Sequence, residues 1–154
     1  MTLGSKAPDF TLQNTDGEKV TLSELTGDKN LVLLFFPLAF TGTCTEELCH
    51  TRDNMKIYDS LNANVAGISV DSFFTLKKFK EAQNLNFTLL SDFNKEVSKN
   101  YNSLYEDFFG MRGVSKRSAF VIDTEGKIRY SEILEDASKL PDFDKIHSTL
   151  EDLV

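Results

Sequence analysis

The stretch LVLLFFPLAFTGTCTEELC, residues 31–49, decides the fold of this chain. It opens with a continuous apolar run that ends at Pro37, which is typical of a strand buried on both faces at the centre of a sheet. Residues 43–61 follow with helical character, because at about 100° per residue one stripe collects apolar and small side chains: Cys44, Leu48, Thr51, Met55 and Tyr58. A central strand that leads through a short loop into a long helix indicates an α/β fold.

Two β-hairpins are predicted near the ends of the chain. Residues 9–12 and 18–21 alternate polar and apolar side chains around an Asn-Thr-Asp-Gly turn. Residues 118–123 and 127–131 are two further strands that flank a Thr-Glu-Gly turn. Hairpins place antiparallel strands beside the central strand, so the sheet is expected to be mixed.

The middle of the chain alternates strands and helices. Residues 64–70 are predicted to form a second buried strand and residues 88–91 a short one. Helices are expected after a cap at Ser72 and near residues 94–100. Residues 101–113 carry aromatic side chains and two glycines without a clear period, so we expect a loop there.

The order of these elements predicts the fold class. A last amphipathic helix is expected near Pro141 from apolar residues at helical spacing: Phe143, Ile146, Leu150 and Leu153. Crossover connections combined with a terminal hairpin and helix predict an α/β, thioredoxin-like fold, with a mixed sheet flanked by helices and an N-terminal hairpin extension. No repeat and no linker rich in Pro, Gly or Ser interrupts residues 1–154, so we expect one domain.

The charge of the chain disfavours some classes of partner. Its 154 residues include 17 Lys and Arg against 24 Asp and Glu, a formal net charge of −7. This charge repels phosphate backbones and anionic membranes, so we expect no nucleic-acid or membrane partner. No apolar run approaches the roughly 20 residues of a membrane span, and Met1 precedes no apolar signal core. We therefore expect a cytoplasmic protein with two reduced cysteines.

The candidate reactive residue is Cys44. Thr43 and Glu46 fit the T-x-x-E capping box, which would place Cys44 in the first turn of a helix. Backbone N–H groups and the helix dipole there favour the thiolate, the reactive form of cysteine. Glu46 and Glu47 oppose this effect, so a reactive Cys44 needs a cation from elsewhere in the chain. The alternative is an unreactive cysteine that packs as a small apolar side chain.

The same segment resembles the active-site signature of the peroxiredoxins, P-x-x-x-[T/S]-x-x-C. Type and spacing match at Pro37, Thr41 and Cys44. The strand sequence R-x-x-F-V-I-D of that family is similar to Arg117–Asp123, and the opening P-D-F-x-L is similar to Pro8–Leu12. The run FPLAFTG looks most like the alkyl hydroperoxide reductase E branch, with the bacterioferritin comigratory protein branch as its nearest rival.

The resemblance implies a role for each matching residue. Cys44 would be the peroxidatic nucleophile, which attacks a hydroperoxide and becomes a sulfenic acid. Thr41 would hold the peroxide through its hydroxyl, and Pro37 would limit the access of water to the sulfur. Arg117 would supply the missing cation and stabilise the charge that develops on oxygen. Glu47 would orient Arg117.

A second cysteine, Cys49, lies five residues after Cys44. On an ideal helix this spacing puts the two Cα atoms about 8.7 Å apart, whereas a disulfide needs about 4.4–6.8 Å. The resemblance makes Cys49 a candidate resolving cysteine that would act only after the helix unwinds locally. The alternative is a structural Cys49, with an external thiol reducing the sulfenic acid.

Other candidate residues have simpler interpretations. His50 is expected to point away from the reactive cysteine, and His147 to lie on the surface. Arg52 is expected to pair on the helix surface or at an interface. The Cys and His spacing lacks the fourth ligand of a structural zinc site, so we expect no bound metal. Phe40 and the pair at residues 108–109 are candidates for lining a peroxide pocket or a subunit face.

By resemblance, the chain is expected to be a cytoplasmic thiol peroxidase that forms a homodimer. It would reduce hydrogen peroxide and organic hydroperoxides without haem, flavin, metal or other cofactor. Its reductant would be thioredoxin, glutaredoxin or a low-molecular-weight thiol. A thioredoxin-type disulfide oxidoreductase fits less well, because residues 44–47 read Cys-Thr-Glu-Glu and lack a C-x-x-C. A peroxide sensor and a redox-inert interaction domain remain open alternatives.

Overall fold

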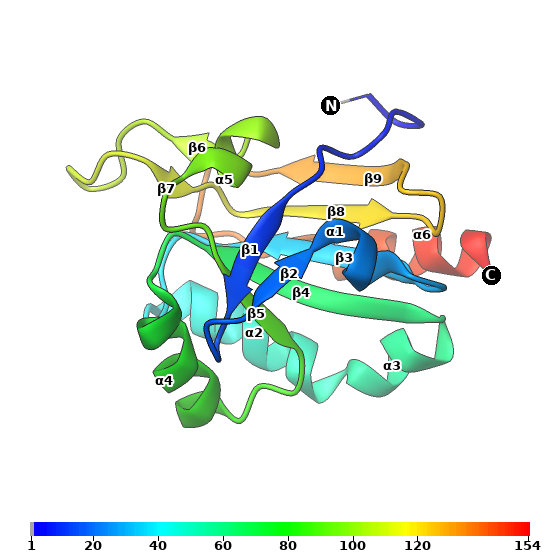
Figure 1. Cartoon of the computed structure of the whole chain (residues 1–154), viewed down its shortest axis with the longest axis horizontal. Coiled ribbons are helices and arrows are strands. Elements are labelled where there is room, and N and C mark those ends of the chain that lie inside the picture. Colours follow the sequence, from blue (N-terminus) through cyan, green and yellow to red (C-terminus); the bar gives the residue numbers. More distant parts are fainter. Residues whose placement is uncertain (1) are drawn as a thin grey trace.

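The computed structural model describes residues 2–154, and its core is one mixed β-sheet (Figure 1). Within these residues the sheet has seven strands in the order β2-β1-β5-β4-β3-β8-β9. The bounds of the strands are β1 (Thr11–Asn14), β2 (Lys19–Thr21), β3 (Asn30–Phe35), β4 (Ala63–Ser69), β5 (Thr88–Ser91), β8 (Ser118–Ile122) and β9 (Ile128–Ile133). Both predicted hairpins and the mixed α/β sheet are confirmed.

The strand that we predicted to be central, β3, lies one position away from the centre of the sheet. The middle position belongs to β4, which pairs in parallel with β3 on one side and with β5 on the other. Strand β3 pairs on its other side with β8 in antiparallel register, with Phe35 opposite Ser118. Because β3 has partners on both edges and is covered on both faces, its six residues are fully buried. The sequence therefore predicted its burial correctly but its place wrongly.

Helices cover both faces of the sheet. Their bounds are α1 (Leu22–Thr26), α2 (Gly42–Asp53), α3 (Met55–Ser60), α4 (Phe73–Gln83), α5 (Glu96–Asn100) and α6 (Phe143–Leu153). In Figure 1, α1 lies in front of the sheet and α2 and α6 lie behind it. Along β3, Val32 and Leu34 pack with residues of α2, α3, α4 and α6, whereas Leu31 and Leu33 pack with residues of α1 and α5. None of the helices described is long and apolar enough to cross a lipid bilayer.

Three elements differ from the sequence prediction. The helix expected over residues 43–61 is divided at Asn54 into α2 and α3. The expected loop over residues 101–113 contains a small hairpin, β6 (Leu104–Tyr105) and β7 (Val114–Ser115). Helix α1 was not predicted, because its five residues are too few to display a helical period. Its first turn is capped by Thr21, whose hydroxyl accepts the backbone N–H of Glu24.

Candidate active site

The candidate nucleophile lies in the first turn of α2, as predicted, but the predicted cap is wrong. Thr41 occupies the N-cap position and α2 begins at Gly42, so Thr43 already lies inside the helix. The Thr41 hydroxyl donates to the carbonyl oxygen of Leu38 at 2.7 Å. The helix begins two residues earlier than the capping box implied, because the carbonyl oxygen of the extended Thr41 already accepts the N–H of Thr45. Cys44 is therefore the third helical residue, close to the unpaired N–H groups of the helix end.

Strand pairing brings the missing cation to Cys44. Arg117 directly precedes β8, and the β3–β8 register places the start of β8 beside the end of β3, where the loop to α2 begins. The Arg117 Nη2 atom donates to Cys44 Sγ at 3.1 Å. The cysteine is 1% exposed and the arginine side chain is 2% exposed. A guanidinium in a poorly solvated site stabilises a thiolate more strongly than it would in water.

The rest of the guanidinium is also held. Arg117 Nη1 donates to Glu47 Oε1 at 2.6 Å, and Arg117 Nε donates to the carbonyl oxygen of Ala137 at 2.9 Å. Glu47 lies one turn after Cys44 on α2, so both acids face the same arginine. The guanidinium group of arginine is planar and its N–H donors point in fixed directions, so one arginine can bind all three acceptors at once. The structure thus brings Cys44, Glu47 and Arg117 together.

Glu47 is an unusual carboxyl group, because it is fully buried beside a cation. Burial raises the pKa of Glu47 to about 7, although the charge and hydrogen bond of Arg117 act in the opposite direction and Glu132 adds a small upward effect. Among the described residues, Glu47 Oε2 has no hydrogen-bond partner. One buried arginine therefore faces two acidic groups, and near neutral pH Glu47 is poised between its charged and neutral forms.

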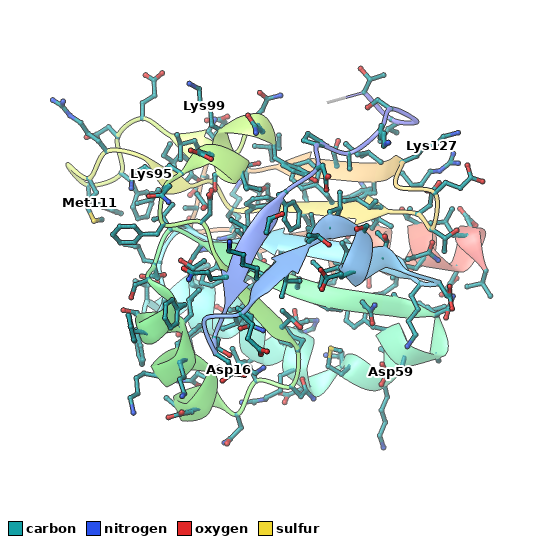
Figure 2. The ribbon with its side chains drawn as sticks, viewed as in Figure 1. Asp16, Asp59, Lys95, Lys99, Met111 and Lys127 are labelled. Carbon is teal, nitrogen blue, oxygen red and sulfur yellow. The ribbon has the colours of Figure 1, made fainter. Side chains whose placement is uncertain are left out.

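A cavity of about 570 Å³ opens beside the sulfur. Its lining includes the polar groups of Thr41, Cys44 and Arg117, and also Asp107, Glu135, Asp136 and Ser138. Its apolar lining comes from the loop after β3 and from the β6–β7 hairpin: Pro37, Leu38, Tyr105, Phe108, Phe109 and Met111. Figure 2 shows Met111 on this hairpin, at the edge of the molecule.

The hairpin residues were only partly predicted as a wall of the cavity. Phe108 and Phe109 line the cavity, as the sequence suggested. Phe40 does not line it, and its ring packs against that of Phe79 with the ring centroids 5.1 Å apart. Tyr105 and Met111 were missed. Their signal in the sequence was the aromatic density of residues 101–113, which we interpreted as a loop without a period.

Cys49 lies on the same unbroken helix as Cys44, and both cysteines are free. Cys49 is partly buried, and its Sγ donates to Gln83 Oε1 at 3.4 Å. Arg52 donates from Nη1 to the carbonyl oxygen of Gln83 at 2.6 Å. The C-terminal end of α4 therefore holds the flank of α2 at Cys49, on a different side from the Arg117 contact of Cys44.

The two histidines lie together, outside the cavity lining. The His50 ring packs against Phe143 with ring centroids 4.2 Å apart. His147 was predicted as a surface residue, but it is partly buried and its Nε2 lies 3.2 Å from the hydroxyl of Tyr58. The last helix packs His147 over α3, a contact between distant parts of the chain that the sequence did not reveal. Burial lowers the pKa of His147.

Comparison with known proteins agrees with the fold. Residues 3–131 match the AhpC/TSA family. Alkyl hydroperoxide reductase E of Mycobacterium tuberculosis is 38% identical over 135 residues, which cover 86% of each chain. Peroxiredoxin Bcp of Escherichia coli is 39% identical over 129 residues, which cover 82% of each chain. The crystal structure of peroxidoxin BcpB from Mycobacterium tuberculosis superposes with a TM-score of 0.90 at 33% identity, over 100% of this chain and 99% of that one.

A thioredoxin-like sheet with a buried cysteine at a helix N-terminus, held by an arginine, is the framework of a thiol-dependent peroxidase. The chain belongs to the AhpC/TSA family and is a peroxiredoxin. Enzymes of this family act on hydroperoxides with thiol reductants. The resemblance noted in the sequence is therefore confirmed, and relatives of both suggested branches are found at similar identity.

Proposed function

We propose that this peroxiredoxin reduces hydrogen peroxide and organic hydroperoxides at Cys44. The observation that carries the proposal is the 3.1 Å contact from Arg117 Nη2 to Cys44 Sγ, two residues that both line the cavity. A thiolate there has a fixed cation beside it and an opening through which a small substrate reaches it. The apolar wall from the β6–β7 hairpin supports organic hydroperoxides as substrates beside hydrogen peroxide.

The proposed reaction is an in-line displacement at oxygen. The Cys44 thiolate attacks the terminal oxygen of the hydroperoxide, an S–O bond forms, and the O–O bond breaks. The sulfur becomes a sulfenic acid, while the leaving alkoxide or hydroxide takes a proton and departs as alcohol or water. Arg117 stabilises the negative charge as it moves from sulfur to the leaving oxygen.

The other site residues act around this step. The Thr41 hydroxyl, at the N-cap of α2, accepts the hydrogen bond of the peroxide and orients it. Pro37 forms part of the cavity wall and limits the access of water to the sulfur. Glu47 holds the guanidinium of Arg117 through the 2.6 Å contact, so that its second nitrogen points at Cys44. Substitution of each of these residues tests the role proposed for it.

The second part of the proposal concerns Cys49 as the resolving cysteine. Its thiol would attack the sulfur of the Cys44 sulfenic acid, which forms a disulfide and releases water. Because both residues lie on intact α2, the helix must unwind locally before the sulfur atoms meet. A thiol reductant (thioredoxin, glutaredoxin or a low-molecular-weight thiol) then returns both cysteines to the thiol form.

Intact mass spectrometry after one equivalent of hydrogen peroxide, with alkylation of free thiols, tests both parts. The wild type should lose two hydrogens, and Cys49→Ser should retain a sulfenic acid on Cys44. A sulfenic acid in both proteins makes Cys49 structural and assigns resolution to an external thiol. No oxidation of Cys44 in either protein contradicts the peroxidase assignment and leaves a redox-inert domain. A mixed disulfide with one specific client would instead favour a peroxide sensor.

We further propose a homodimer. Several aromatic side chains near the cavity mouth and on α4 are exposed, Phe109 at 89% and Phe40 and Phe74 to smaller extents. Exposed aromatic surface of this kind is typical of protein interfaces. Sedimentation velocity over a range of concentrations is the test. A monomer at every concentration contradicts the proposal, whereas a dimer whose dissociation constant rises in Phe109→Ser supports it.

Compartment and domain organisation complete the proposal. A cytoplasmic location fits the two free cysteines, which a reducing compartment maintains. We also propose that residues 1–154 act as one domain, since helices on both faces pack against one sheet. One cooperative unfolding transition, equal by fluorescence and far-ultraviolet circular dichroism, is expected. Two separated transitions would contradict a single domain.

A further inference from the structure

Two loops meet at one edge of the sheet. Strands β3 and β4 are parallel neighbours, so their carboxyl ends lie at the same edge. Strand β3 leads into residues 37–41, which carry the proposed peroxide-binding residues. Strand β4 leads into residues 70–72, which end at the cap of α4. The side chain of Asp71 connects the two loops.

Asp71 makes hydrogen bonds in several directions. Its Oδ2 accepts the backbone N–H of Ala39 at 2.8 Å and the hydroxyl of Ser69 at 2.7 Å. Its own N–H donates to Ser69 Oγ at 3.2 Å, and its carbonyl oxygen accepts the Ser91 hydroxyl at 2.6 Å. Asp71 is therefore held by β4 and β5, and it offers Ala39 a fixed acceptor.

The Ala39 N–H lies where the loop turns toward α2. Ala39 is 8% exposed, and the next residue, Phe40, has a φ of 62°. Thr41 then forms the N-cap of α2. Within residues 2–154, residues 37–41 make one other hydrogen bond to a strand or helix, from the backbone N–H of Thr45 in α2 to the carbonyl oxygen of its cap, Thr41, at 2.9 Å. The Asp71 contact therefore fixes the orientation of the peptide group that carries the Ala39 N–H. From this peptide the chain continues through the left-handed conformation of Phe40 into α2.

We propose that Asp71 is a positioning residue for peroxide reduction. By holding Ala39 it keeps Pro37 and Thr41 in place against Cys44, so that a bound peroxide meets the sulfur in line. Asp71 is not among the cavity-lining residues, and it acts through the loop rather than on the substrate. This inference rests on the proposed peroxidase function, and it adds a residue that the sequence motif does not contain.

The test compares two reactions of Cys44 in the same variants. One is the second-order rate constant with hydrogen peroxide, measured by competition with horseradish peroxidase. The other is alkylation by iodoacetamide, which needs a reactive thiolate but no aligned O–O bond. In Asp71→Ala we expect the peroxide rate to fall by about ten- to a hundredfold, because small misplacements in an active site cost rates of this order. The alkylation rate should stay within about twofold of the wild type.

Conservative and backbone variants separate positioning from general disruption. Asp71→Asn keeps a carbonyl oxygen with two lone pairs, so it should retain a peroxide rate within about threefold of the wild type. Replacing Ala39 by lactic acid exchanges only the N–H for an ester oxygen and should reproduce the selective loss even if Asp71→Ala does not fold. Asp123→Ala is the matched control, since Asp123 ties a turn at the opposite end of β8, where its Oδ1 accepts two backbone N–H groups at 2.9 Å.

Each outcome bears on the inference. Selective loss of the peroxide rate in Asp71→Ala and in the Ala39 ester, with rescue in Asp71→Asn, supports it. It is overturned if these variants keep the wild-type peroxide rate, if both rates fall alike, or if Asp71→Asn falls as far as Asp71→Ala. A wild-type protein that reacts with peroxide no faster than a free cysteine contradicts the proposed function instead.

Discussion

The buried carboxyl group of Glu47 predicts a specific dependence of stability on pH. Its pKa is raised from 4.5 to about 7, mainly because burial disfavours the charged form. An acid whose pKa is higher in the folded protein binds more protons when folded. Its stabilising contribution is therefore complete below about pH 4.5 and is lost as the pH rises through about 7.

The magnitude follows from the size of this shift. At about 1.4 kcal/mol for each pKa unit, the change from 4.5 to about 7 corresponds to about 3.5 kcal/mol of unfolding free energy between the two pH limits. Glu47 is 0% exposed, so solvent does not screen this contribution. Glu47→Gln removes the titrating group and keeps an oxygen that accepts from Arg117. The free energy of unfolding of this variant should therefore not show the decrease that the ionisation of Glu47 causes between pH 5 and 8.

Urea unfolding of the wild type and Glu47→Gln at pH 5, 6, 7 and 8 measures the effect. The wild type should lose stability relative to the variant by about 2.5 kcal/mol over this range, because the unfolded carboxyl group is already mostly ionised at pH 5. Glu46→Gln is the matched control, because Glu46 is the adjacent residue of α2 and is exposed. Parallel stability curves for the wild type and Glu47→Gln would refute the reasoning, as would an equal effect in Glu46→Gln.

Three further substitutions test the site and the core. Arg117→Ala should lower the rate constant with peroxide by about 10²–10³-fold, because it removes a donor that stabilises developing negative charge. An unchanged rate constant in a competition assay would contradict the role of Arg117. Thr41→Val removes the hydroxyl and should lower the rate constant with peroxide by about tenfold or more, while the rate of iodoacetamide alkylation changes little. An equal fall in both rates would exclude peroxide binding by Thr41. Leu34→Ala, in the buried strand β3, should lower the free energy of unfolding by about 2–5 kcal/mol, measured by urea titration. A loss below about 1 kcal/mol would contradict close packing of Leu34.

The site depends on two segments that are distant in the sequence. Cys44 and Glu47 come from one turn of α2, and Arg117 comes from the start of β8. The pairing of β3 with β8 places them together, because both the loop to α2 and Arg117 lie at the same end of these strands. The site is therefore assembled by the sheet, and a change in the β3–β8 register would move Arg117 away from the sulfur.

Local patterns in the sequence were sufficient for much of the molecule. The apolar run of β3, the hairpin turns and the helical spacing of α4 and α6 each report on residues a few positions apart. Ser72 caps α4 through the N–H of Thr75, as predicted. The family resemblance was evident from short motifs, and so was a helix start next to Cys44, although the cap is Thr41 and not Thr43.

The tertiary structure decided what depends on distant parts of the chain. The sequence predicted a need for a cation and the resemblance named Arg117, but the physical reason that Arg117 reaches Cys44 and Glu47 is the pairing of β3 with β8. The central position of β4, the cavity wall from the β6–β7 hairpin and the contact of His147 with Tyr58 were likewise not visible locally. Local periodicity reports which face of an element is apolar, whereas the partner of that face is chosen by the packing of the whole chain.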